Sequence, residues 1–243
     1  MDIWYGNAVP EMTESGMTPE INTAERRTTA DDVFDFLLKQ INSLKLLPGT
    51  RISEIEVARQ FDVSRQPVRE AFIRLADNGL LLVRPQKATT VRRFSNQRIL
   101  QARFIRSAVE CDVLRLVCRK GLGKHQARLE RALAAQDKAL KDQDVERFHD
   151  LDYDFHKALC DAADSPFVFG TIADNKAQVD RLCMLSLAEP ATMDELFADH
   201  QDIMAALVAQ DEPAVLKAIT HHLSRLDDVV TGIRRSHAEY FED

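Results

Sequence analysis

Hydrophobic residues recur at steps of three and four along most of the chain, which is the spacing of one face of an amphipathic helix. The first such run spans 31–44 and ends before Pro48-Gly49, and two shorter helical runs follow at 53–62 and 64–78. Two short stretches of residues that favour β-structure, 80–84 and 89–93, then enclose a turn and predict a small hairpin. The apolar positions of the first helix are Val33, Phe34, Leu37, Leu38, Ile41 and Leu44.

The pattern changes after Ser95, and from there on we find only long helical periods. Glycine, proline and aspartate residues interrupt these periods and set the expected end of each helix. A capping box, Ser/Thr-x-x-Glu, is expected to begin two of the helices of the chain, at Ser53–Glu56 and at Thr192–Glu195. The chain after Ser95 therefore predicts an antiparallel bundle of six helices. Their expected bounds are 96–120, 124–141, 144–163, 166–188, 193–209 and 212–234.

The composition favours two domains of mainly α-helical structure. The chain has 243 residues, whereas a typical domain has roughly 100–200. Only 8 of the residues are glycine, which leaves little material for tight turns or a glycine-rich nucleotide-binding fold. Residues 1–28 lack a helical period and are expected to form a disordered arm. We place a first domain at 29–94, an all-helical domain at 95–235 and a short tail at 236–243.

Other features bear on the location of the protein. No segment reaches the ~18–20 continuous apolar residues that a membrane-spanning helix needs, so we expect no membrane association. The N-terminus is polar and acidic, unlike a secretory signal. The four cysteines lack C-x-x-C spacing and are interpreted as reduced thiols. Together these features predict a cytoplasmic protein.

The first domain has the plan of a winged helix-turn-helix, with three short helices followed by a hairpin. Its third helix would present its first turns to base edges in the major groove, where Arg65 and Arg69 suit guanine and Gln66 suits adenine. Ser64 and the helix N-terminus can hold a phosphate. Residues 50–93 carry nine lysines and arginines against five acidic residues, a local excess of +4 in a chain of net charge −7. A basic head on an acidic body is what attraction to DNA phosphates requires. The alternative is that the arginines form only a solvated helical face.

Two stretches of this domain are recognisable. They are Pro48-Gly-Thr-Arg-Ile-Ser-Glu54 and Phe61-Asp-Val-Ser-Arg-Gln-Pro-Val-Arg-Glu-Ala71, followed by Arg74-Leu75 and Gly79-Leu80. Over about 31–94 the chain closely resembles the DNA-binding domain of GntR-type bacterial transcriptional regulators. The resemblance implies that Arg65 and Arg69 read bases or phosphates and that 80–93 is a minor-groove wing; we add Arg51 and Lys87 to the expected DNA contacts. The family wing usually has a glycine at its tip, whereas this chain has Ala88, which reaches a positive φ less readily.

The second domain carries residues that could bind a metal ion. Asp152 and His156 are four residues apart and therefore project from one face of a helix. His200 and His222 lie in two further predicted helices. Three imidazoles and one carboxylate could converge on a divalent ion with coordination positions left open. Spacing alone cannot establish that they converge, and each histidine could equally be an ordinary core or surface residue.

A second resemblance bears on these residues. Residues 96–234 look like the FCD domain, the fatty-acid-regulator C-terminal type that follows the DNA-binding head in one GntR branch. Its metal-binding members have D-x-x-x-H, H-x-x-I and H-L motifs, which match Asp152–His156, His200–Ile203 and His222-Leu223. The resemblance therefore implies a divalent metal, and zinc, nickel and manganese all suit three nitrogens and one oxygen.

The same resemblance implies a small carboxylate effector beside the ion. An arginine in the cavity would neutralise its charge, because a guanidinium binds a carboxylate in a bidentate manner. Arg106 matches a family arginine on the first helix of the bundle, and Arg181 on the fourth predicted helix is a second candidate. A plain salt bridge is an equal alternative for each, and Glu110 is four residues from Arg106.

These observations predict a ligand-responsive transcriptional regulator and not an enzyme. As in the family, we expect a repressor that acts as a homodimer on the palindromic half-sites of a double-stranded DNA operator. One alternative is a metal sensor, in which the ion itself is the signal. Another is a metallohydrolase built on a helical bundle with an appended DNA-binding head, because such a site can activate water. We find no general base or nucleophile motif in the sequence that favours the hydrolase.

Overall fold

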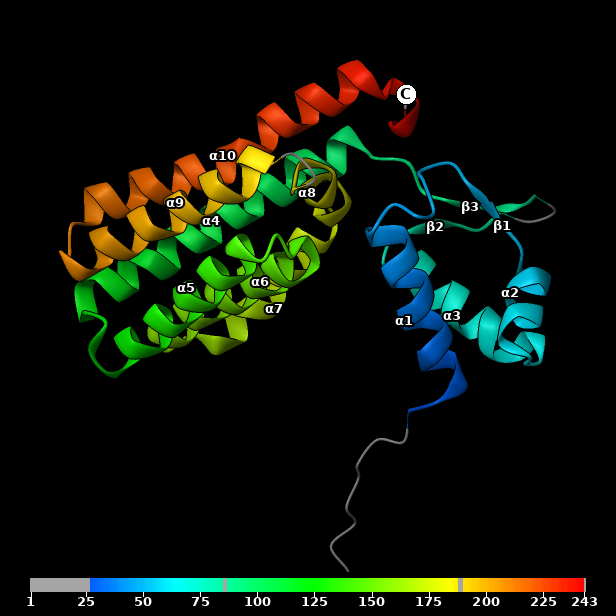
Figure 1. Cartoon of the computed structure of the whole chain (residues 1–243), viewed down its shortest axis with the longest axis horizontal. Helices are drawn as coiled ribbons and strands as arrows, with labels where there is room; N and C mark the ends of the chain where they lie inside the picture. Colours follow the sequence, from blue (N-terminus) through cyan, green and yellow to red (C-terminus); the bar gives the residue numbers. More distant parts are fainter. Residues whose placement is uncertain (1–26, 85–86, 188–189, 243) are drawn as a thin grey trace, which may run out of the picture.

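A computed structural model describes residues 27–84, 87–187 and 190–242. The predicted arm at 1–28 falls outside these ranges except for its last two residues. Gln86, at the predicted wing tip, also lies outside them. The protein has the predicted fold class, a mainly α-helical chain with a small sheet in its N-terminal domain and a helical bundle after it (Figure 1).

The N-terminal domain consists of α1 (Thr29–Asn42), α2 (Glu54–Phe61) and α3 (Arg65–Asp77) with a small antiparallel sheet. The sheet contains β1 (Arg51–Ile52), β2 (Leu81–Leu82) and β3 (Thr89–Val91) in the order β1-β3-β2. Strands β2 and β3 are the predicted hairpin, in shorter form. Strand β1 was not predicted, because its two residues form no recognisable run. The domain has its own core, which includes Val33, Leu37, Ile41, Val68, Phe72 and Leu75.

The helix starts of this domain differ from the prediction. Helix α1 begins with a capping box, in which Thr28 and Asp31 each bond the other's backbone amide. The box predicted at Ser53–Glu56 is wrong, because the Ser53 side chain makes no capping hydrogen bond. The first turn of α2 is closed by the backbone instead, where the Val57 amide donates to the Ser53 carbonyl at 3.1 Å.

The C-terminal domain is the predicted bundle, in which α4 and α10 run side by side along its length (Figure 1). Its main core gathers side chains from α4, α6, α9 and α10, among them Leu114, Val117, Phe155, Ile203 and Ile219. The helices are α4 (Asn96–Lys120), α5 (Gln126–Lys141), α6 (Val145–Ala162), α7 (Phe169–Ala177), α8 (Asp180–Leu187), α9 (Pro190–Val208) and α10 (Glu212–Ser236). Short 3-10 turns lie at Gly123–His125, Pro166–Val168 and Ala238–Tyr240.

Two of the predicted helix boundaries in the bundle are wrong. The stretch 166–188, predicted as one helix, is divided into α7 and α8 by a turn at Gln178 and Val179. Neither residue is a helix breaker, so the sequence gives no sign of this turn. Helix α9 already includes Thr192, which was predicted to cap it, because its described part runs from Pro190 to Val208.

The two domains are joined at residues 92–95. The ring of Phe94 is buried and packs against Phe241 from the predicted tail. The Phe94 amide donates to the Tyr240 carbonyl at 2.8 Å, and the Glu242 amide donates to the Phe94 carbonyl at 2.8 Å. Helix α8 contributes Arg181, which donates to the Arg92 carbonyl at 2.6 Å and lies over the Phe94 ring. Both the C-terminal residues and α8 therefore contact the link between the domains.

Within the described ranges, none of the helices is long and apolar enough to cross a membrane.

Candidate metal centre and DNA-reading head

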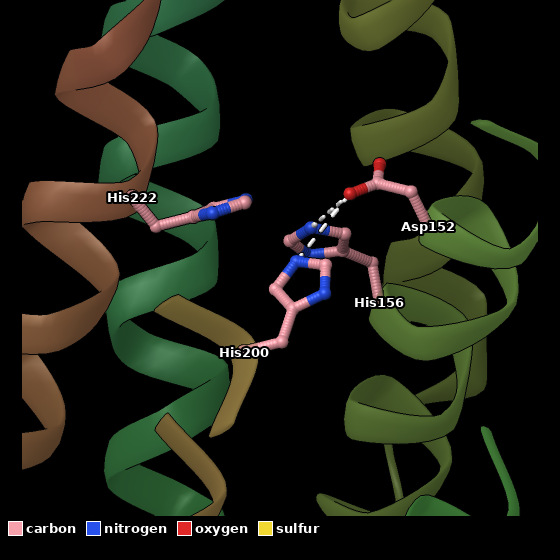
Figure 2. A group of neighbouring side chains, drawn as sticks. All are labelled: Asp152, His156, His200 and His222. Atoms are coloured by element: carbon pink, nitrogen blue, oxygen red, sulfur yellow. Dashed lines mark ion pairs between the residues drawn. The ribbon is translucent and has the colours of Figure 1, made fainter. Parts of the chain in front are cut away.

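Four side chains from three helices meet inside the bundle (Figure 2). Asp152 and His156 lie one turn apart on α6, His200 projects from α9 and His222 from α10. One potential ligand atom from each residue lies within 4.8 Å of those of the other three. The Asp152 Oδ1 atom is 3.4 Å from His200 Nε2 and 3.8 Å from His156 Nε2. The fold therefore brings together all four residues that the sequence suggested as ligands.

The donor atoms are suited to an ion. All four side chains are buried, and His200 is fully so. Within the described part of the chain, the Nε2 atoms of His156 and His200 have no hydrogen-bond partner. An unpaired polar atom in a protein interior costs free energy, so such atoms usually have a partner. A divalent ion would supply the missing partner for these two nitrogens, which both face the same carboxylate oxygen.

Polar residues behind the cluster orient two of the imidazoles. His156 Nδ1 lies 2.7 Å from Glu110 Oε2, and His200 Nδ1 lies 2.9 Å from Gln136 Oε1. The Gln136 oxygen accepts the ring hydrogen of His200 at Nδ1 and leaves the Nε2 lone pair of that ring free for a metal. Gln136 is completely buried on the inner face of α5.

The other two residues of the cluster also have polar neighbours. His222 Nδ1 is 3.5 Å from Asp199 Oδ2, and Asp199 is itself paired with Arg225. Asp152 uses its second oxygen, Oδ2, to contact the buried ammonium of Lys176 at 3.2 Å. Lys176 thus holds the Asp152 carboxylate, whereas the described structure gives His222 Nδ1 only this ion-pair contact and no hydrogen bond.

The protonation of the cluster also suits metal binding. Burial lowers the pKa of His200 well below its ordinary value, and the neighbouring His222 lowers it further. Burial likewise lowers the pKa of His222. Burial would by itself raise the pKa of Asp152, but Lys176 and the histidines hold it well below its ordinary value. At neutral pH these two imidazoles are neutral and the carboxyl is ionised, which are the forms that bind a metal.

A cavity of about 320 Å³ opens beside the cluster, and Asp152 and His222 form part of its wall. Arg106 and Lys176 also line it, as do apolar side chains of α8, α9 and α10. The Arg106 guanidinium is buried and donates from Nε to Glu110 Oε1 at 2.7 Å. Its Nη2 atom has no partner among the described residues. The salt bridge with Glu110 thus exists, yet it leaves part of the guanidinium free to bind a ligand.

Arg181, the second arginine suggested for an effector, is not among the residues that line this cavity. Its guanidinium instead holds the link between the domains through the Arg92 carbonyl and the Phe94 ring. Burial and the nearby Arg92 lower the pKa of Arg181 to about 10. We therefore correct the effector assignment and retain only Arg106.

The residues expected to contact DNA lie on the surface of the N-terminal domain. Ser64 is the N-cap of α3, although its side chain makes no capping bond. Arg65, Gln66 and Arg69 follow it in the first turns of α3 and are exposed. Arg51 lies exposed in β1, and Lys87 lies exposed just before β3. The structure thus presents all six residues to solvent.

Several residues of the site were missed in the sequence. Glu110, Gln136, Asp199 and Lys176 orient the four central side chains, but none of them is part of the motifs that suggested a metal. Gln136 did carry a signal, because it is a polar residue on the apolar stripe of its helix, between Leu129 and Ala139. Glu54, which contacts two of the arginines expected to read DNA, was also missed.

Comparisons with known proteins agree with both parts of the structure. The family model for bacterial regulatory proteins of the gntR family matches residues 29–91, and that for the FCD domain matches residues 101–225. The chain is 35% identical over 227 residues to the HTH-type transcriptional repressor RspR of Escherichia coli K12, covering 93% of this chain and 100% of that protein. It is 24% identical over 226 residues to the transcriptional regulator LutR of Bacillus subtilis, covering 84% and 98%.

Solved structures share the fold. Escherichia coli McbR/YncC superimposes with a TM-score of 0.68 at 22% identity, covering 85% of this chain and 99% of that one. A GntR regulator from Rhodococcus sp. RHA1 gives a TM-score of 0.66 at 22% identity, covering 83% and 97%. At this level of identity the likeness shows the fold alone.

Proposed function

The chain belongs to the gntR family of bacterial transcriptional regulators and carries an FCD domain, and from this premise we propose that it is a repressor controlled by a small carboxylate. The carboxylate would bind beside a divalent metal ion in the bundle and change the affinity of the head for its operator. The observation that carries this proposal is the buried cluster of Asp152, His156, His200 and His222 at the wall of a cavity that also holds Arg106.

The four clustered residues would hold the ion through three nitrogens and one oxygen, a set that suits zinc, nickel or manganese. When bound, the ion supplies a Lewis-acidic centre with open positions for ligand oxygens. Glu110, Gln136 and Lys176 would keep the ligand side chains oriented. The residues beside the cluster therefore act by positioning.

Arg106 is the reason for proposing a carboxylate as the effector. Arg106 lines the cavity, and its Nη2 atom is buried and lacks a partner in the described structure. A carboxylate oxygen would supply that partner through a charge-assisted hydrogen bond. A second oxygen of the same molecule could reach the ion, since Asp152 and His222 line the same cavity.

Of the two alternatives, only the metal sensor has support. The matched families and the named relatives are transcription regulators, so nothing favours the hydrolase. A sensor that responds to the ion alone would use the same cluster. A metal sensor would change its DNA affinity when the metal alone is added, whereas the proposed repressor would require both the metal and a carboxylate.

A titration separates them. Affinity for a duplex selected from a random library is measured with zinc, nickel or manganese alone, and then with a panel of small mono- and dicarboxylates added. We expect a response of roughly 5–150-fold only when acid and metal are both present, which is the usual range of allosteric coupling. Arg106→Lys keeps the charge that faces Glu110 but loses the guanidinium fork, so it should keep the metal and weaken the response to acid. A full response to metal alone would favour the sensor.

We also propose a homodimer that reads two operator half-sites. Two hollows lie along α4 and expose large apolar side chains. Leu100 and Phe104 line the first, with 61% and 76% of their surface exposed. Phe167 of the 3-10 turn Pro166–Val168 lines the second and is 81% exposed. Exposed large apolar side chains gathered on one side of a helix commonly mark a protein interface. A second copy related by a two-fold axis would bury the same surface on both subunits. Two heads related in this way would match a palindromic site.

Phe104→Asp is expected to weaken the dimer by roughly 30-fold or more, because it places a charge in the centre of an apolar interface. Sedimentation equilibrium over a range of concentrations measures the effect. Val208→Asp, which changes an exposed apolar residue at the end of α9, serves as the control and should leave the dimer intact. If the Phe104→Asp protein remains a dimer of wild-type affinity, the surface of α4 around Phe104 is not the interface.

A further inference from the structure

One carboxylate contacts both of the arginines expected to read DNA. Glu54 is the first residue of α2, and its Oε2 atom lies 2.9 Å from Arg65 Nη2 and 3.5 Å from Arg69 Nη2. The side chain of Glu54 is 23% exposed, whereas those of Arg65 and Arg69 are 56% and 55% exposed. The carboxylate is therefore partly covered, while the guanidinium groups lie in solvent.

Other acidic residues near this surface differ. Glu56 lies on the same helix and is exposed, and the described structure gives it no ion pair or hydrogen bond. Glu70 accepts a hydrogen bond from Gln66 on its own helix. Glu54 thus links the start of α2 to the first turns of α3, at the edge that would enter the major groove.

The arrangement has two physical consequences. Arg65 and Arg69 are one helical turn apart, and like charges at that spacing repel each other. A shared carboxylate offsets the repulsion and restricts two long side chains that would otherwise sample many rotamers. A negative charge at this edge also opposes the attraction of DNA phosphates, which does not depend on sequence. An exposed ion pair contributes little to folding stability, so its main effect falls on DNA binding.

We propose that Glu54 is a positioning residue for operator reading, which holds Arg65 and Arg69 in the geometry that matches base edges and so separates the operator from other DNA. This inference rests on the proposed DNA-binding function of the head. Glu54 acts through the arginines and contributes discrimination rather than affinity for DNA in general.

The test is a selection of duplexes from a random library by the full-length wild type, Glu54→Gln, Glu54→Asp and the control Glu56→Gln. Each protein is then titrated with the duplex that the wild type selects and with a scrambled duplex. Glu54→Gln and Glu56→Gln remove the same charge from the same helix. Glu54→Asp keeps the charge but is one methylene shorter, so it cannot span both arginines.

We expect the wild type and Glu56→Gln to select the same motif. Both glutamine variants should bind the scrambled duplex more tightly, because each removes one negative charge. The ratio of the affinity for the selected duplex to that for the scrambled duplex should fall by about tenfold in Glu54→Gln and in Glu54→Asp. A change of this size is within the discrimination that one bidentate base contact provides. Glu54→Asp should show this loss without tighter binding to the scrambled duplex.

If both Glu54 variants keep the wild-type motif and ratio, Glu54 contributes only charge and the inference is wrong. If the wild type itself selects no motif, the proposed operator reading fails and the inference fails with it. The two failures are therefore distinguishable. Circular dichroism of each variant checks the fold, and Glu54→Asp alone decides the question should Glu54→Gln unfold.

Discussion

Replacing His200 and His222 together with alanine is expected to remove the metal ion from the protein. The change deletes two of the four donors and leaves Asp152 and His156, which both come from α6. Ligand pairs on a single helix cannot enclose an ion within the bundle, and even loss of an outer-shell partner commonly costs 10–100-fold in affinity. Metal content measured by mass spectrometry should fall from about one ion per chain to about a tenth or less.

The chain offers a matched control for this experiment. His221 is the neighbour of His222 on α10, and its side chain is 60% exposed. His221→Ala should therefore retain the ion. Full stoichiometric metal in the double variant would refute the assignment of the cluster. The experiment also decides which of zinc, nickel and manganese the wild type retains when all three are supplied.

Arg65→Ala and Arg69→Ala are each expected to lower affinity for the selected duplex by roughly 5–150-fold. This range corresponds to about 1–3 kcal/mol for a bidentate contact between arginine and guanine. Binding to a scrambled duplex should fall much less, because it depends on phosphate contacts that other basic residues also make. Fluorescence anisotropy with both duplexes measures the two effects.

Arg119→Ala removes the same charge from the bundle and provides the control. Arg119 is exposed near the end of α4, outside the DNA-reading head. Its replacement should leave both affinities close to those of the wild type. Unchanged sequence-specific binding in both Arg65→Ala and Arg69→Ala would rule out α3 as the recognition helix.

Much of the fold could be predicted because its signals are local. The period of hydrophobic residues identified α1, α4 and α10, and glycine or proline marked most helix ends. The turn between α7 and α8 could not be predicted, since Gln178 and Val179 are not helix breakers. Strand β1 has two residues, and it is ordered by pairing with β3 rather than by a pattern of its own.

The site was harder to predict because it depends on long-range packing. Asp152 and His156 share a helix face, so their proximity follows from sequence spacing alone. The approach of His200 and His222 to them depends on how α9 and α10 pack, which spacing left open and the resemblance to a family implied. Arg181 shows the opposite case, since a buried arginine on the expected helix faces the link between the domains instead of the cavity.

Helix α8 has a further consequence for signalling within the molecule. Arg181, near the start of α8, donates a hydrogen bond to the Arg92 carbonyl, while Ser186 and Leu187 at its end line the cavity. Six residues of α-helix span only about 9 Å. A ligand that displaced the C-terminal end of α8 would therefore also displace Arg181 at its other end. Arg181 contacts the segment that joins the bundle to the DNA-binding domain. Communication between the two domains would then need no relay through the bundle core.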